Sequence, residues 1–143
     1  MTATEIIQVL IVDDHPIVRH GMATLIEQEE DLKVCGEAGD ATQALEIVQR
    51  LRPHVAIVDV SLAEGDDGLH LIEQIRREHP TVRILVVSMH DVESYAQRAI
   101  KAGAIGYLSK SQATDHIVDA IRRVHAGERF IGPGEAAPSH WFG

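Results

Sequence analysis

Hydrophobic residues along the chain follow two alternating patterns. Short, nearly continuous apolar runs, which are typical of strands buried on both faces of a sheet, occupy 6–12, 55–58, 82–87 and 105–108. A weaker run at 32–38 is interrupted by polar residues and indicates an edge strand. Segments with apolar residues at helical spacing lie between and after these runs. The five predicted helices begin near Pro16, Asp40, Asp67, Asp91 and Ser111.

Residues suited to helix ends stand at the predicted boundaries. Pro16 fits a first helical turn because the missing N–H has no partner there in any case. Asp40 is a favourable N-cap residue, and Gly103 and Gly127 are typical of the position just after a helix.

The strict alternation of strand and helix predicts a parallel sheet with helices on both faces. Five strands joined by right-handed crossovers favour a flavodoxin-like, doubly wound α/β fold with strand order 2-1-3-4-5 and five helices. We expect this domain to span residues 6–127. The segment 128–143 is rich in Gly, Pro and Ala and is predicted to be a linker or a disordered tail.

Composition narrows the class of protein. The chain has 143 residues, of which 45% are hydrophobic, 24% charged and 3% aromatic, so one aliphatic core is expected. The net charge of −9 argues against nucleic-acid binding by this domain, because such binding needs clustered Lys and Arg. Cys35 is the single cysteine and is predicted to be a small buried hydrophobe. With no apparent signal peptide or membrane span, we expect a cytoplasmic protein.

Five chemically useful side chains stand at the ends of four predicted strands. Asp13 and Asp14 follow the first strand, Asp59 follows the third, Ser88 ends the fourth and Lys110 ends the fifth. Ligands of such sheets bind beyond the carboxyl ends of the strands, so these groups are expected to share one cleft.

The three carboxylates predict a divalent cation. Two carboxylates 4 Å apart repel each other by about 4 kcal/mol at an effective dielectric constant of 20, so protons or a cation must neutralise part of their charge. Oxygen ligands favour Mg²⁺, which leaves positions open for a phosphoryl group. Lys110 and Ser88 would bind that group, and Asp59, on the central strand, would attack a phosphoryl donor to form an acyl phosphate.

The same residues carry a family resemblance. The stretches "IVDDHP", "AIVDVSL", "VVSMHD" and "GYLSKS" occur in the order and near the spacing of response regulator receiver domains, the CheY-like modules of two-component signal transduction. The resemblance covers the chain from about Gln8 to Gly127. "DDHPIVRHGM" and "AIRRVHAGERF" resemble the NarL/FixJ (LuxR-type) branch in particular.

The resemblance implies a phosphoacceptor and its metal ligands. Asp59 would accept a phosphoryl group from a sensor histidine kinase. Asp14 would bind Mg²⁺ directly, Asp13 would help partly through water, and the backbone carbonyl of Ser61 would complete the protein ligands. The chain would then be a signalling module that catalyses only its own phosphorylation and dephosphorylation.

The resemblance also implies a switch. Ser88 would hydrogen-bond the phosphoryl group, and Lys110 would pair with it. Tyr107 would change rotamer, unless it is only a half-buried tyrosine at a strand edge. Ser61 and His90 would tune the lifetime of the phosphorylated form.

The chain departs from the family pattern at three places. Ala63 replaces a proline that is usual in the loop after the acceptor, and Ser111 stands where many relatives have a cis-proline. The LuxR-type branch normally continues into a helix-turn-helix domain that binds DNA and regulates transcription. We therefore expect DNA contact only through a domain absent from this sequence, which is either a piece of a longer regulator or a natural single-domain regulator. A homodimer is a further expected partner.

Three other functions fit less well. Haloacid-dehalogenase-type phosphatases usually carry a second acid two residues after the nucleophile, where this chain has Ser61. A flavodoxin-like electron carrier would meet repulsion between its flavin phosphate and the acid pair. The third is a metal-binding histidine protein. The nine histidines are scattered without a ligand spacing on one helix face, so they are predicted to be surface residues.

Overall fold

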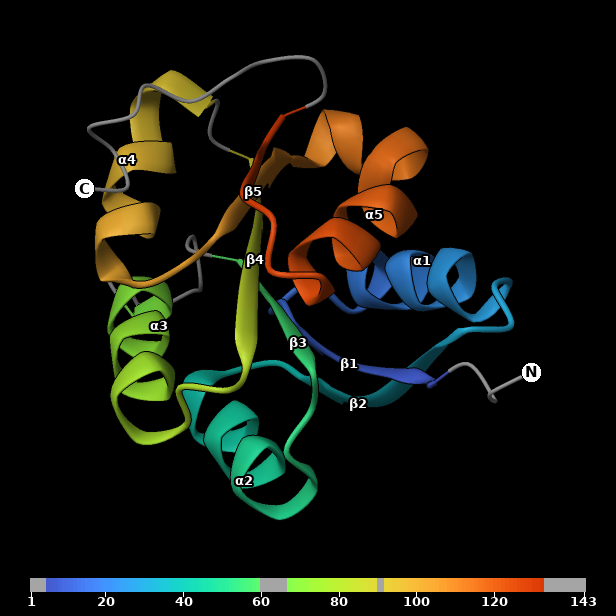
Figure 1. The fold of residues 1–143 in the computed structure, drawn as a ribbon, viewed down its shortest axis with the longest axis horizontal. Coiled ribbons are helices and arrows are strands. Elements are labelled where there is room, and N and C mark those ends of the chain that lie inside the picture. Colours follow the sequence, from blue (N-terminus) through green and yellow to red (C-terminus); the bar gives the residue numbers. More distant parts are fainter. Residues whose placement is uncertain (1–4, 60–66, 90–91, 133–143) are drawn as a thin grey trace.

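The computed structural model describes residues 5–59, 67–89 and 92–132. Within them, parallel strands form one sheet with the order β2-β1-β3-β4-β5-β6 (Figure 1). The strands are β1 (Ile7–Val12), β2 (Leu32–Ala38), β3 (Val55–Val58), β4 (Arg83–Ser88), β5 (Gly106–Ser109) and β6 (Phe130–Ile131). The predicted doubly wound order of the first five strands is confirmed.

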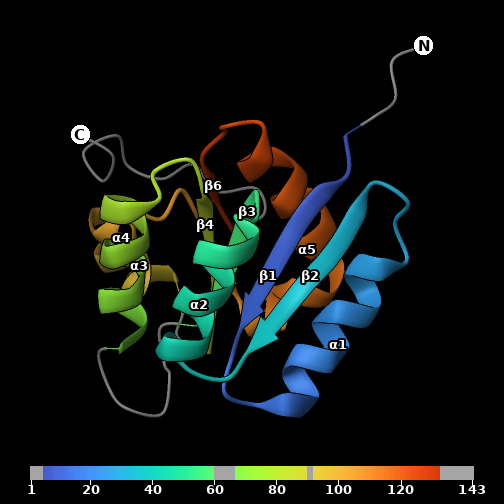
Figure 2. The same ribbon diagram turned by 90° about the horizontal axis from the view of Figure 1, so that it is seen from below.

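Five helices cover the two faces of this sheet within the described residues. They are α1 (Pro16–Glu27), α2 (Ala41–Leu51), α3 (Asp67–Glu78), α4 (Val92–Ala102) and α5 (Lys110–His125). Figure 2 shows α1 and α5 on one side and α2, α3 and α4 on the other. None of the described helices is both long and apolar enough to cross a bilayer.

The strands are apolar because each face of the sheet packs against helices. Leu10 and Val12 of β1 lie in the hydrophobic cluster of the α2–α4 side, whereas Val9 and Ile11 lie in the cluster of the α1 and α5 side. All four residues of β3 are buried. The alternation of side chains along a strand therefore feeds both clusters, which explains the continuous apolar runs.

Strand β2 is an edge strand, as its polar interruptions predicted. Only Leu32 and Ala38, its first and last residues, are buried. Cys35 is half-buried instead of buried, and this burial raises the pKa of its thiol.

The sheet has a sixth strand where five were predicted. The N–H of Phe130 donates to the carbonyl of Ile105 at 3.1 Å, and the N–H of Gly132 donates to that of Tyr107 at 2.9 Å. This strand lies in the segment predicted as linker or tail, of which 133–143 fall outside the described residues. A strand of two residues is too short to show a periodic pattern, so the sequence did not reveal it.

The structure contains all four predicted helix-end features, and Pro16 is the first residue of α1. Asp40 caps α2, since its Oδ1 accepts a hydrogen bond from the N–H of Gln43 at 2.8 Å. Gly103 and Gly127 follow α4 and α5 with φ angles of 132° and 86°. Both angles lie in the region that glycine adopts without steric cost.

Helix α5 begins earlier than predicted. Its N-cap is Ser109 instead of Ser111, and the N–H of Ser109 donates to Gln112 Oε1 at 3.2 Å. Lys110 is therefore the first residue of the helix and not the last of the strand. The capping contact fixes the point from which the lysine side chain extends.

The close approach of β4, β5 and α5 at Gly106 gives a stability test. A Cβ at Gly106 would lie 2.8 Å from both Leu85 Cδ1 and Val124 Cγ2, whereas one at Gly21 in α1 would meet nothing within 4 Å. We expect Gly106→Ala to lower the free energy of unfolding by about 1–3 kcal/mol through overpacking. Gly21→Ala, the control, should raise it by about 0.5–1 kcal/mol because alanine favours a helix. Urea denaturation measures both, and an unchanged midpoint for Gly106→Ala would contradict the packing described here.

Candidate functional site

Two acids are brought together by the pairing of β1 with β3. The strands are parallel, with Val12 opposite Val58, and the N–H of Asp59 donates to the carbonyl of Val12 at 3.0 Å. Asp13 and Asp59 therefore leave the sheet side by side at its carboxyl edge. Their exposed fractions are 0% and 1%, so two carboxylates are buried next to each other.

Lys110 lies between these two carboxylates. Its Nζ is 2.9 Å from Asp13 Oδ2 and 3.1 Å from Asp59 Oδ2, and its side chain is 11% exposed. Burial lowers the pKa of Lys110, but the interactions with Asp13 and Asp59 raise it by more, so the net pKa is above the usual value. The ammonium group is therefore retained at neutral pH and neutralises part of the acidic charge.

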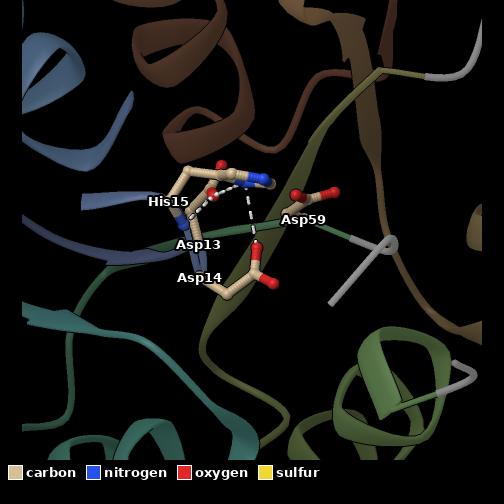
Figure 3. A group of neighbouring side chains, drawn as sticks. All are labelled: Asp13, Asp14, His15 and Asp59. Carbon is tan, nitrogen blue, oxygen red and sulfur yellow. Dashed lines mark hydrogen bonds and ion pairs between the residues drawn. The ribbon is translucent and has the colours of Figure 1, made fainter. Parts of the chain in front are cut away.

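His15 is exposed at the surface, as predicted for the histidines, but its ring also lies in the acidic cluster, which the sequence did not indicate. Its Nδ1 lies 3.0 Å from Asp13 Oδ1 and 3.0 Å from Asp14 Oδ1. Its backbone N–H also donates to Asp13 Oδ1 at 2.8 Å. Figure 3 shows the imidazole beside the acid pair, with Asp59 facing it across the site. Its position directly after two acids was the only signal in the sequence.

Arg19 is a second residue that the sequence did not point out. Its Nη1 donates to the backbone carbonyl of Asp13 at 2.6 Å, and its Nε donates to Glu37 Oε1 of β2 at 3.3 Å. The contact joins the start of α1 and the end of β2 to the strand end that carries the acids. Arg19 therefore helps to hold the turn between β1 and α1.

The donor set fits a divalent cation. Asp13, Asp14, His15 and Asp59 each offer one ligand atom, and these atoms lie within 4.8 Å of one another. Asp13 Oδ2 lies 2.9 Å from Lys110 Nζ, and Asp14 Oδ1 lies 3.0 Å from His15 Nδ1. A cation bound between the carboxylates would neutralise further negative charge. The carboxylate oxygens are the ligands that Mg²⁺ prefers.

The other predicted site residues are placed as follows. Ser88 is buried at the end of β4, next to β3, and Ser109 lies opposite it in β5. Tyr107 is fully buried in the cluster on the α2–α4 side, which differs from a half-buried tyrosine at a strand edge. Ser61 and His90 lie outside the described residues.

Residues 9–122 match the family model of the response regulator receiver domain. The chain belongs to this family. This receiver is 35% identical over 127 residues to the response regulator GacA of Pseudomonas aeruginosa, covering 89% of this chain and 59% of GacA. It is 36% identical over 134 residues to the transcriptional regulatory protein MctR of Rhizobium johnstonii, covering 94% of this chain and 62% of MctR. The receiver thus spans about three fifths of the length of these relatives.

Solved structures agree with this assignment. A LuxR-family two-component response regulator from Aurantimonas sp. SI85-9A1 is similar to this receiver with a TM-score of 0.84 and 35% identity, covering 90% of this chain and 91% of the other. The response regulator domain of Thermotoga maritima CheB, at 24% identity and a TM-score of 0.77, shares the fold and covers 85% of this chain and 98% of the other. The predicted resemblance to the LuxR-type branch is confirmed.

The acidic cluster predicts stabilisation by magnesium. At a concentration 100 times the dissociation constant, Mg²⁺ should raise the free energy of unfolding by about 2.7 kcal/mol. Asp14→Asn should lose most of this gain because a ligand charge is removed. Asp119→Asn, on the exposed face of α5, should keep it in full. Urea denaturation with and without Mg²⁺ measures the effect, and a full gain in Asp14→Asn would exclude that carboxylate as a ligand.

Lys110 is expected to stabilise the fold in the absence of metal. Lys110→Met leaves Asp13 and Asp59 buried without their cation and should lower the free energy of unfolding by about 3–5 kcal/mol. Because the folded pKa of Lys110 is raised, its contribution is complete below the unfolded pKa of about 10.4 and is lost as the pH rises through the folded value.

Denaturation of both proteins in EDTA between pH 7 and 11 tests this expectation. The difference between them should stay constant to about pH 10 and shrink above it. Lys101→Met, at an exposed position in the last turn of α4, is the control and should cost less than about 1 kcal/mol. A Lys110→Met protein as stable as this control would show that the buried pair carries no net stabilisation.

Proposed function

We propose that this receiver accepts a phosphoryl group on Asp59 from a sensor histidine kinase and changes conformation in response. The observation that carries the proposal is the buried Asp59 carboxylate, which lies 3.1 Å from the Lys110 ammonium and beside Asp13 and Asp14. A carboxylate held at one end of a parallel sheet, with a cation on one side and metal ligands on the other, is suited to attack a phosphoryl donor.

The residues of the site would divide the work of the transfer. An Asp59 oxygen forms the bond to phosphorus while the bond to the kinase histidine nitrogen breaks, and that nitrogen keeps the electron pair. Mg²⁺, when bound, neutralises charge on the transferring group. Asp13, Asp14, Asp59 and the backbone carbonyl of Ser61 are the proposed metal ligands. Lys110, which pairs with Asp59 before transfer, would pair with the phosphoryl oxygens afterwards.

The phosphoryl group would then bias the switch. It adds a charge of about −1.5 to −2 at a site where Lys110 and the hydroxyl of Ser88 can bind it. Changing the ratio of the active to the inactive conformation from 1:99 to 99:1 needs a differential interaction free energy of roughly 5.5 kcal/mol. A few charge-assisted hydrogen bonds of about 1.5–3 kcal/mol each would together supply that amount. Ser88 ends β4 just before α4, and Tyr107 lies on the neighbouring β5, so movement at Ser88 would reach both.

The proposed output is control of transcription. MctR, to which this receiver is similar, is named a transcriptional regulatory protein. DNA contact would come from a LuxR-type domain outside this sequence, in agreement with the net charge of −9.

We further propose a cytoplasmic location and a homodimer. In this proposal residues 6–127 act as the receiver, 128–143 as a linker or tail, and Ser61 and His90 tune the phosphoryl lifetime. The chain would act on itself and on no other substrate.

Phosphorylation by a small-molecule donor tests the acceptor. Incubation with Mg²⁺ and acetyl phosphate should add one phosphoryl group, detected by intact-mass spectrometry. Asp59→Asn should abolish the addition because the amide is a poor nucleophile. Asp115→Asn, at an exposed position of α5, is the matched control and should be labelled like the wild type. Labelling of Asp59→Asn at the wild-type level would show that another residue is the acceptor.

A further inference from the structure

A strand of two residues covers the free edge of β5, and the proposed phosphoryl transfer has no use for it. β6 pairs with β5 in parallel, with Phe130 opposite Gly106 and Ile131 opposite Tyr107. The N–H of Gly132 donates to the carbonyl of Tyr107 at 2.9 Å. Without β6 the strand order would end at β5, and Tyr107 would stand on an edge strand.

The side chain of Ile131 closes this edge beside Tyr107. Side chains of the two paired residues point to the same face of the sheet, and both lie in the hydrophobic cluster on the α2–α4 side. Ile131 is 4% exposed although it lies in the outermost strand, and Tyr107 is 0% exposed. A tyrosine is usually buried only in part, as the five-strand prediction implied here. The added strand accounts for the complete burial.

The two ends of β6 are held by different contacts. At its start, the Arg123 guanidinium of α5 lies 5.9 Å from the centre of the Phe130 ring, and its Nη1 lies 3.6 Å from Glu128 Oε1. At its end, the strand is attached through Tyr107, by the packing of Ile131 and by the hydrogen bond from Gly132. The end of β6 therefore depends on where the tyrosine side chain lies.

The position of Tyr107 is linked in turn to Ser88. β4 lies between β3 and β5, so Ser88 has the Asp59 side of the sheet on one flank and β5 on the other. Val86 lies opposite Tyr107, and Ser88 comes two residues later, so Ser88 and Tyr107 point to the same face. A phosphoryl group on Asp59 that draws Ser88 toward β3 would draw it away from β5 and leave Tyr107 more room in the α2–α4 cluster.

We propose that β6 is a latch that couples Tyr107 to the chain after residue 132. With the ring inside the α2–α4 cluster, Ile131 packs beside it and β6 pairs with β5. When the ring turns outward over the edge of β5, it takes the space of Ile131, and the end of β6 detaches. By linkage, whatever favours the inward ring also favours the paired strand.

Phosphorylation of Asp59 therefore strengthens the pairing of β6, and it fixes the direction in which the chain leaves the sheet. This last step rests on the proposed function, whereas the coupling between Tyr107 and Ile131 does not.

Hydrogen exchange of single amides, measured by NMR on the full 143-residue chain, tests the pairing. Ile131→Ala removes most of the side chain beside Tyr107, so the Gly132 amide should exchange at least about tenfold faster through local opening. Ile131→Val should lie between this variant and wild type. Ile7→Ala is the matched control, because Ile7 is 5% exposed at the first position of β1, which β3 and β4 separate from β5. It should leave the Gly132 rate unchanged.

The ring of Tyr107 gives a readout that packing of β6 alone would not change. Because the chain has two tyrosines, 3-fluorotyrosine in a Tyr95→Phe background labels Tyr107 only. The difference in ¹⁹F shift between H₂O and D₂O measures ring exposure. In Ile131→Ala it should rise toward that of the urea-unfolded chain, as an outward ring requires, and in Ile7→Ala it should stay at the wild-type value. Faster exchange at Gly132 with a ring that stays buried in Ile131→Ala would overturn the proposal.

The effect of phosphorylation is scored separately. In wild type labelled by acetyl phosphate, the Gly132 amide should exchange at least about fivefold more slowly than in the unlabelled protein. The Ile7 amide, which donates to the Asp31 carbonyl at 2.8 Å, is the reference for general stabilisation. Unchanged or faster exchange at Gly132 in labelled protein would overturn the coupling of β6 to the site. A wild type that is never labelled overturns the proposed function, and the latch is then decided by Ile131→Ala.

Discussion

The ion pairs of Lys110 with Asp13 and Asp59 are the interaction on which the rest of the site depends. They join the ends of β1 and β3 to the start of α5. Two neighbouring buried carboxylates would repel each other by about 4 kcal/mol at 4 Å and an effective dielectric constant of 20. The lysine offsets this repulsion, and the neighbouring group of Asp13, Asp14, His15 and Asp59 could hold a cation. The charges that stabilise the fold are therefore the same charges on which the proposed phosphoryl transfer would depend.

Helix α5 is held at both ends, which keeps Lys110 in position. Near its C-terminal end, Arg122 binds Asp31 through two hydrogen bonds of 3.0 and 2.8 Å and Glu29 through one of 2.9 Å. The hydrogen bonds to Arg122 hold the pKa of Asp31 below its usual value. These contacts tie α5 to the turn between α1 and β2, while the lysine ties it to β1 and β3. The sheet and the helix are thus fixed relative to each other across the site.

The acids at the strand ends also separate this receiver from other functions of the same fold. A flavodoxin-like sheet alone does not define a function, because many ligands bind at this edge. Here the edge carries buried carboxylates, which would repel a flavin phosphate unless a cation lay between them. The family match over residues 9–122 and the similar LuxR-family structure, like the acidic charge of the site, indicate a receiver and not a flavin-binding protein. His15 places an imidazole nitrogen 3.0 Å from carboxylate oxygens of Asp13 and Asp14 at the same edge.

The sequence by itself determined the alternation of strands and helices and the residues that stand at the strand ends, because both are local patterns read over a few residues. The sequence therefore indicated Asp13, Asp14, Asp59 and Lys110 as site residues. Only the tertiary structure decided that Lys110 lies between Asp13 and Asp59, that Arg19 holds the Asp13 carbonyl, that His15 turns its Nδ1 toward the acids, and that β6 completes the sheet. These features arise from contacts between side chains or strands whose direction depends on packing and helix starts, and no periodicity in the sequence records that direction.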